Sequence, residues 1–166
     1  VEWRVDWFEN VFEFDKVEEV LKELRDALGN IPILMTFRTS KEGGEKAIEP
    51  EAYAKLNIKA AQTGYVDFVD VEIFTGDEIV KKIIDGVHAA GARVIASNHD
   101  FFKTPAQSDI VYRLRKMQDM GADIPKMQLC HRISETYSHF FLLQRKWLQI
   151  TLTDQLSQCQ WQAQVL

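Results

Sequence analysis

Cysteine is scarce in this chain of 166 residues: Cys130 and Cys159 are too few for a disulfide scaffold and lack the spacing of a zinc site. No apolar run approaches the roughly 20 residues that a membrane-spanning helix needs, and no signal-peptide pattern opens the chain. Positive charge is also in deficit, because 20 lysines and arginines stand against 25 acidic residues and give a net charge of −5. These absences argue against a nucleic-acid or membrane surface and favour one reduced, cytoplasmic domain.

Glycine-rich phosphate-binding motifs are missing as well. Neither G-x-G-x-x-G nor G-x-x-x-x-G-K follows any of the apolar segments, which counts against nucleotide binding. Residues 127–166 contain no glycine and no proline, yet they hold both cysteines and eight of the eleven glutamines. A compositional shift of this size is typical of a tail, a linker or an artefact. We therefore divide the chain into a partial domain, residues 1–126, and an aberrant C-terminal tail, residues 127–166.

The sequence does contain a regular alternation of strand and helix signals. Apolar or alternating segments predict strands, and amphipathic segments between them predict helices. The expected strands cover residues 1–7, 31–37, 66–73, 93–96 and 124–129, and the expected helices 15–28, 50–63, 77–90 and 104–120. This βαβ order predicts an α/β fold with a parallel sheet. A doubly wound sheet and a (β/α) barrel both fit, and we favour an incomplete barrel of about five βα units.

Polar residues gather where the predicted strands end. Ser97 and Asn98 are expected to end the fourth strand, so that His99 and Asp100 lie just beyond it. The next strand carries one lysine, Lys126, in an otherwise apolar run, where burying an ammonium group without a partner is costly. Loops after parallel strands converge on one face, so we expect a site there. The other strand ends contribute Glu2, Arg4, Arg38, Glu42, Asp70 and Glu72.

Each of these residues also has a purely structural interpretation. A histidine after a strand can cap it or face solvent, a strand lysine can reach water, and arginines can be structural ion-pair partners. Asp70 and Glu72 have the same parity along their strand, so they face one side together and need a cation. Carboxylates with an imidazole could hold a divalent ion. Two arginines and a lysine in the same mouth disfavour that ion and suit an anionic or polyhydroxylated substrate, so we expect no metal and no cofactor.

Five segments of the chain carry a specific resemblance. They are EWRVD at residues 2–6, PILMTFRTSKEGGE at 32–45, DFVDVE at 67–72, ASNHDF at 96–101 and IPK at 124–126. In order and in register, from Val1 to Lys126, they resemble type I 3-dehydroquinate dehydratase. The resemblance implies a (β/α)8 TIM barrel, commonly a homodimer. It also implies a lyase that converts its small-molecule partner, 3-dehydroquinate, to 3-dehydroshikimate in the shikimate pathway of aromatic amino-acid biosynthesis, without a metal.

The same resemblance implies a role for each candidate residue. Lys126 matches the Schiff-base lysine, His99 the proton-transfer residue, and Glu42 the carboxylate that supports His99. The chemistry suits these residue types, because an iminium at C3 acidifies the C2 proton, which an imidazole can remove. The residues that hold the substrate hydroxyls and order the site are matched by Glu2, Arg4 and Arg38.

The sequence departs from the family at both ends. The family's first strand is expected before Val1, and residues 127–166 do not follow the family's pattern. Suppose that one nucleotide was lost directly after the Lys126 codon. Codons for the tail can then be chosen so that restoring this nucleotide gives an amino-acid sequence that resembles the family's continuation. This predicts a frameshifted, truncated product. One alternative is therefore a remnant that cannot close a barrel and is not an enzyme. The enzymatic alternative is another class I Schiff-base barrel, such as an aldolase.

Overall fold

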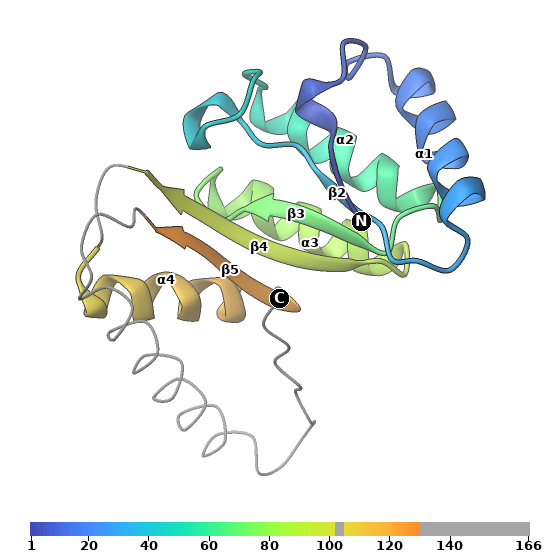
Figure 1. Cartoon of the computed structure of the whole chain (residues 1–166). Coiled ribbons are helices and arrows are strands. Elements are labelled where there is room, and N and C mark those ends of the chain that lie inside the picture. The colour runs from blue at the N-terminus through green and yellow to red at the C-terminus, as the bar shows by residue number, and fades with distance from the viewer. Residues whose placement is uncertain (102–104, 130–166) are drawn as a thin grey trace, which may run out of the picture.

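The computed structural model describes residues 1–101 and 105–129, and within them one parallel sheet runs in the order β1-β2-β3-β4-β5. Figure 1 shows the sheet curving from the N-terminal strand to β5. The strands are β1 (Glu2–Arg4), β2 (Leu34–Thr36), β3 (Phe68–Glu72), β4 (Arg93–Asp100) and β5 (Ile124–Leu129). The α-helices between them are α1 (Phe14–Leu28), α2 (Pro50–Gln62), α3 (Asp77–Ala89) and α4 (Gln107–Asp119). Each helix is thus a crossover between neighbouring parallel strands.

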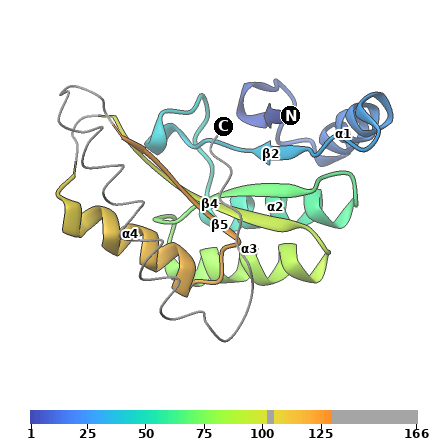
Figure 2. The same ribbon diagram turned by 60° about the horizontal axis from the view of Figure 1, so that its bottom comes forward.

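The two faces of the sheet differ in chemistry, because side chains alternate along each strand. On the helix side, fully buried residues such as Met35, Val69 and Val94 pack into one core with α1, α2 and α3. In Figure 2, α2, α3 and α4 lie alongside the strands that they cover. The other face carries Thr36, Asp70 and further polar side chains, which are also buried. The predicted parallel α/β architecture is therefore confirmed, with a polar inner face.

The first predicted strand is too long, because residues 5–7 leave the sheet. Strand β1 ends at Arg4, and the 3-10 helix η1 (Val5–Trp7) follows. The cause is the buried carboxylate of Asp6, which accepts hydrogen bonds from the Arg4 side chain at 2.7 and 2.8 Å. It also accepts hydrogen bonds from the backbone N–H groups of Arg38 and Glu45, each with an N to O distance of 3.2 Å. The chain turns so that Asp6 can bind the loop after β2.

The fourth predicted strand is too short, because β4 extends to Asp100 and includes His99. Pairing with β5 continues through His99↔Gln128 and Asp100↔Leu129, which holds these residues in the sheet. The expectation that they lie beyond the strand end was wrong. Strand β5 itself crosses the expected boundary after Lys126, while residues 130–166 of the expected tail lie outside the described residues. The frameshift stays a prediction.

The remaining elements lie close to their predicted positions. Strand β2 is shorter than expected at both ends, where the N–H of Ile33 donates to the Asp67 carboxylate at 2.7 Å and the N–H of Arg38 donates to Asp6 at 3.2 Å. Helix α4 begins at Gln107 rather than at residue 104, with Ala106 in an extended conformation before it. In the part of the chain that the structure describes, no helix is both long and apolar enough to cross a membrane.

Tyr53 joins helix α2 to the end of β3, and this link generates a stability prediction. Its fully buried hydroxyl donates to the carbonyl oxygen of Asp70 at 3.2 Å and accepts the backbone N–H of Glu72 at 3.1 Å. Tyr53→Phe leaves that N–H unpaired, so the free energy of unfolding should fall by about 1–3 kcal/mol in urea denaturation. Tyr112→Phe, at a residue 60% exposed, is the control and should change it by less than about 0.5 kcal/mol. Equal effects of the two substitutions would contradict this role.

Candidate active site

Arg38, two residues after the end of β2, is a buried cation and is only 3% exposed. Its Nη1 donates to Glu72 Oε1 and to Ser97 Oγ, both at 3.0 Å, and its Nη2 donates to Asp70 Oδ1 at 2.8 Å. Burial alone would lower the pKa of Arg38, but the two carboxylates outweigh it and raise that pKa, so the guanidinium stays charged. The predicted need of Asp70 and Glu72 for a shared cation is confirmed, and Arg38 supplies it.

The two carboxylates of β3 are also held by hydroxyl groups. Ser97 on β4 donates its hydroxyl to Asp70 Oδ1 at 2.5 Å. Thr39 donates its N–H to Glu72 Oε1 at 2.8 Å and its hydroxyl to Oε2 at 2.7 Å. Burial raises the pKa of Glu72, and although the bonds from Thr39 oppose this, the pKa stays above its ordinary value. Charge and hydrogen bonds from the loop after β2, from β3 and from β4 therefore fix this cluster.

Lys126 projects onto the same inner face from β5, where it pairs in register with Ser97. Its Nζ lies 3.4 Å from Asp70 Oδ2 and 3.8 Å from Glu2 Oε1. Glu2 is itself oriented by the Thr36 hydroxyl, which donates to Oε1 at 2.8 Å. The Lys126 side chain is 36% exposed, so its amine is both paired and reachable from solvent. A lysine amine forms Schiff bases with carbonyl compounds, and the carboxylates beside Lys126 hold its amine in position for such a reaction.

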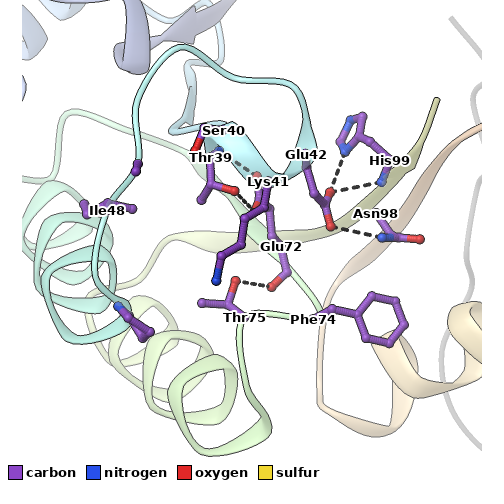
Figure 3. Close-up of a pocket in the computed structure, with 12 residues that line it drawn as sticks. Thr39, Ser40, Lys41, Glu42, Ile48, Glu72, Phe74, Thr75, Asn98 and His99 are labelled. Atoms are coloured by element: carbon purple, nitrogen blue, oxygen red, sulfur yellow. Dashed lines mark hydrogen bonds and ion pairs between the residues drawn. The ribbon is translucent and has the colours of Figure 1, made fainter. Parts of the chain in front are cut away.

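His99 forms the second reactive group, with Glu42 as its partner (Figure 3). Glu42 Oε2 accepts a hydrogen bond from His99 Nδ1 at 2.9 Å and from the His99 backbone N–H at 3.0 Å. The imidazole also stacks on Phe101, with ring centroids 5.9 Å apart. Because a carboxylate only accepts hydrogen bonds, Nδ1 carries the proton, and within residues 1–101 and 105–129 Nε2 takes part in no hydrogen bond. The pair has the geometry of a general base with its orienting group.

The loop that carries Glu42 depends on two glycines of the EGG motif. Glu42 ends the 3-10 helix η2 (Ser40–Glu42), and Gly43 follows in the left-handed conformation at φ 81°. At Gly44, a Cβ atom would lie 1.8 Å from the carbonyl oxygen of Arg38, so no side chain fits there. The sequence thus places Glu42 against His99 by folding the loop tightly onto the end of β2.

Arg4 is the predicted residue that contacts the cluster least directly. Its guanidinium binds Asp6, a bond that raises the pKa of Arg4, and its side chain is 37% exposed. Burial would raise the pKa of Asp6, but the bonds from Arg4 and from two backbone N–H groups keep it lowered. Sequence reasoning missed the positions that complete the site: Asp6, Thr36, Thr39, Ser97, Asn98 and Arg113. Thr36, Ser97 and Asn98 gave a weak signal, because hydroxyl and amide side chains in strands carry no distinctive pattern, whereas Asp6, Thr39 and Arg113 reach the site only through contacts between distant segments.

A cavity of about 290 Å³ opens beside Glu42 and His99 (Figure 3). It lies between the loop after β2 and the ends of β3 and β4, and its lining includes Thr39, Glu72 and Phe74. Within residues 1–101 and 105–129, no three histidine, cysteine or acidic side chains are grouped so that they could hold a metal ion. The described residues thus place the amine of Lys126 and the imidazole of His99 on either side of a buried charge cluster, and Lys41 also lines the cavity.

Comparisons with known proteins agree with this geometry. A family model described as type I 3-dehydroquinase matches residues 1–140. The 3-dehydroquinate dehydratase of Klebsiella pneumoniae is 54% identical over 127 residues, covering 76% of this chain and 51% of the relative. That of Clostridioides difficile is 50% identical, over 76% of this chain and 50% of the relative. The chain therefore spans about half the length of the curated relatives it matches.

Two solved structures show the same fold. Type I 3-dehydroquinate dehydratase from Clostridium difficile, solved with covalently modified comenic acid, superposes with a TM-score of 0.75 at 51% identity. The match covers 76% of this chain and 50% of that one. The 3-dehydroquinate dehydratase of Geobacillus kaustophilus gives a TM-score of 0.83 at 25% identity, over 87% of this chain and 56% of that one. The five-stranded sheet is thus part of the barrel that these proteins form.

Proposed function

The chain belongs to the type I 3-dehydroquinase family, and we propose that it carries the Schiff-base and proton-transfer residues of a 3-dehydroquinate dehydratase. One observation carries the proposal: Lys126 and His99 come from the neighbouring parallel strands β5 and β4, and Lys126 and the Glu42–His99 pair flank one buried charge cluster. Because the chain spans about half the length of its curated relatives, the activity is proposed for the whole protein. The family likeness also supports a cytoplasmic homodimer acting in the shikimate pathway.

Lys126 is the proposed nucleophile. Its neutral amine adds to the C3 ketone of 3-dehydroquinate, and the carbinolamine loses water to give an iminium, which withdraws electrons from C2. Asp70, fixed by Arg38 and Ser97, lies 3.4 Å from Nζ and holds the amine in one position. Glu2 lies at 3.8 Å on the other side. Hydrolysis of the product iminium returns the free amine.

His99 is the proposed base and acid. With Nδ1 bonded to Glu42, its free Nε2 takes the C2 proton that the iminium has acidified. The electron pair left at C2 forms the double bond to C1, and the protonated imidazole donates a proton to the departing C1 hydroxyl, which leaves as water. Arg4 is partly exposed and is suited to bind substrate hydroxyls. Arg38 is buried and instead holds the charged side chains of the site in place.

Borohydride trapping tests the role of Lys126. The whole protein is mixed with 3-dehydroquinate, reduced with borohydride and digested, and the masses of the peptides are measured by mass spectrometry. We expect an adduct on the Lys126 peptide, its complete loss in Lys126→Ala, and no loss in Lys82→Ala, where the lysine is an exposed partner of Glu51. An adduct that persists in Lys126→Ala would remove this lysine from the mechanism.

Substitution of His99 separates proton transfer from imine formation. His99→Ala in the whole protein should still give the Lys126 adduct but slow the dehydration by roughly 10²–10⁴, since only the acid–base group is removed. His88→Ala is the matched control, because that imidazole lies on α3 and pairs with Asp123 at 2.8 Å. Product formation is followed spectroscopically. If His99→Ala also abolished the adduct, His99 would have to act on Lys126 instead.

A further inference from the structure

A chain of hydrogen bonds connects helix α4 to the imidazole of His99. Arg113 Nη1 donates to Asn98 Oδ1 at 2.7 Å, and Asn98 Nδ2 donates to Glu42 Oε1 at 3.0 Å. The other oxygen of Glu42 accepts the Nδ1 proton of His99. Asn98 is 6% exposed and shares the strand parity of Val94 and Ala96, so it reaches Glu42 from the helix side of β4.

The guanidinium at the start of this chain is itself held in place. The carboxylate of Asp109, one helical turn before Arg113, accepts hydrogen bonds from Arg113 Nε at 3.2 Å and from Arg113 Nη2 at 2.6 Å. Asp100 lies 3.7 Å from Nη1, and the ring of Phe74 lies 5.8 Å from the guanidinium carbon. Partners from α4, from β4 and from the turn after β3 therefore restrict where Nη1 can point.

The direction of every bond follows from Arg113. A guanidinium can only donate, so the Asn98 amide must turn its oxygen to Arg113 and its NH2 group to Glu42. A carboxylate can only accept, so Glu42 uses Oε1 for that NH2 group and Oε2 for His99. Without Arg113, the amide could rotate and present its oxygen to Glu42, where two acceptors would repel each other.

We propose that Asn98 and Arg113 are positioning residues for His99, which act through Glu42 to keep the imidazole in the Nδ1–H tautomer with Nε2 free. The consequence for catalysis rests on the proposed function, because the free Nε2 is the atom that takes the C2 proton there. The tautomer itself is a property of the protein without substrate. Lys126 pairs with Asp70 directly, and neither Asn98 nor Arg113 takes part in that ion pair.

The tautomer of His99 is measured by ¹H–¹⁵N correlation of imidazole rings in the 166-residue chain, with His99→Gln to assign the signals. We expect the unsubstituted chain to show a protonated Nδ1 that exchanges slowly with water. Asn98→Ala and Arg113→Met should each lose most of the Nδ1–H tautomer or speed up its exchange by about tenfold or more, since a charge-assisted bond chain is broken. Arg113→Lys, which still donates, should retain the signal.

Arg115→Met is the matched control, because Arg115 lies two residues further along α4 and is exposed. It should leave the His99 signals unchanged. A protonated Nε2 in the unsubstituted chain, or an unchanged Nδ1–H signal in both Asn98→Ala and Arg113→Met, would overturn the inference. Borohydride trapping of Lys126 is independent of these signals, so failure of the proposed function and failure of this inference can be told apart.

Discussion

The burial of one positive charge, on Arg38, is the constraint on which the rest of the site depends. Asp70 and Glu72 lie on one face of β3, where they would repel each other without the guanidinium between them. A buried charge that loses its partner costs about 3–5 kcal/mol, so the cation and the carboxylates must stay together. Lys126 then rests against Asp70, and Glu42 lies 3.7 Å from the same guanidinium. Both reactive groups are thus tied to one buried cluster.

Two groups of different chemistry result from this arrangement. The side chain of Lys126 is partly exposed beside Asp70 and Glu2, while the imidazole of His99 is held by Glu42 through Nδ1. An amine that forms an iminium and an imidazole that moves the adjacent proton are what a β-elimination requires. The chain belongs to the type I 3-dehydroquinase family, superposes on a solved member and spans about half the length of its curated relatives.

Strand periodicity predicted more of the fold and of the candidate site than amino-acid composition did. The parity of Asp70 and Glu72 predicted a shared cation, and the βαβ order predicted the parallel sheet that brings Lys126 beside them. Contacts between distant segments could not be predicted. The Asp6 carboxylate bends the chain out of β1 because it binds a loop more than thirty residues away, and pairing with β5 extends β4 through His99. The role of Asn98 likewise depends on an arginine of the following helix.

A double-mutant cycle between Arg38 and Asp70 tests most directly whether one buried ion cluster organises the site. The free energy of unfolding is measured in urea for the 166-residue chain, for Arg38→Met, for Asp70→Asn and for the double variant. The account predicts that the double variant loses about 1–3 kcal/mol less than the two single losses together, since each residue is costly mainly without the other. Losses that add to within about 0.5 kcal/mol would contradict it.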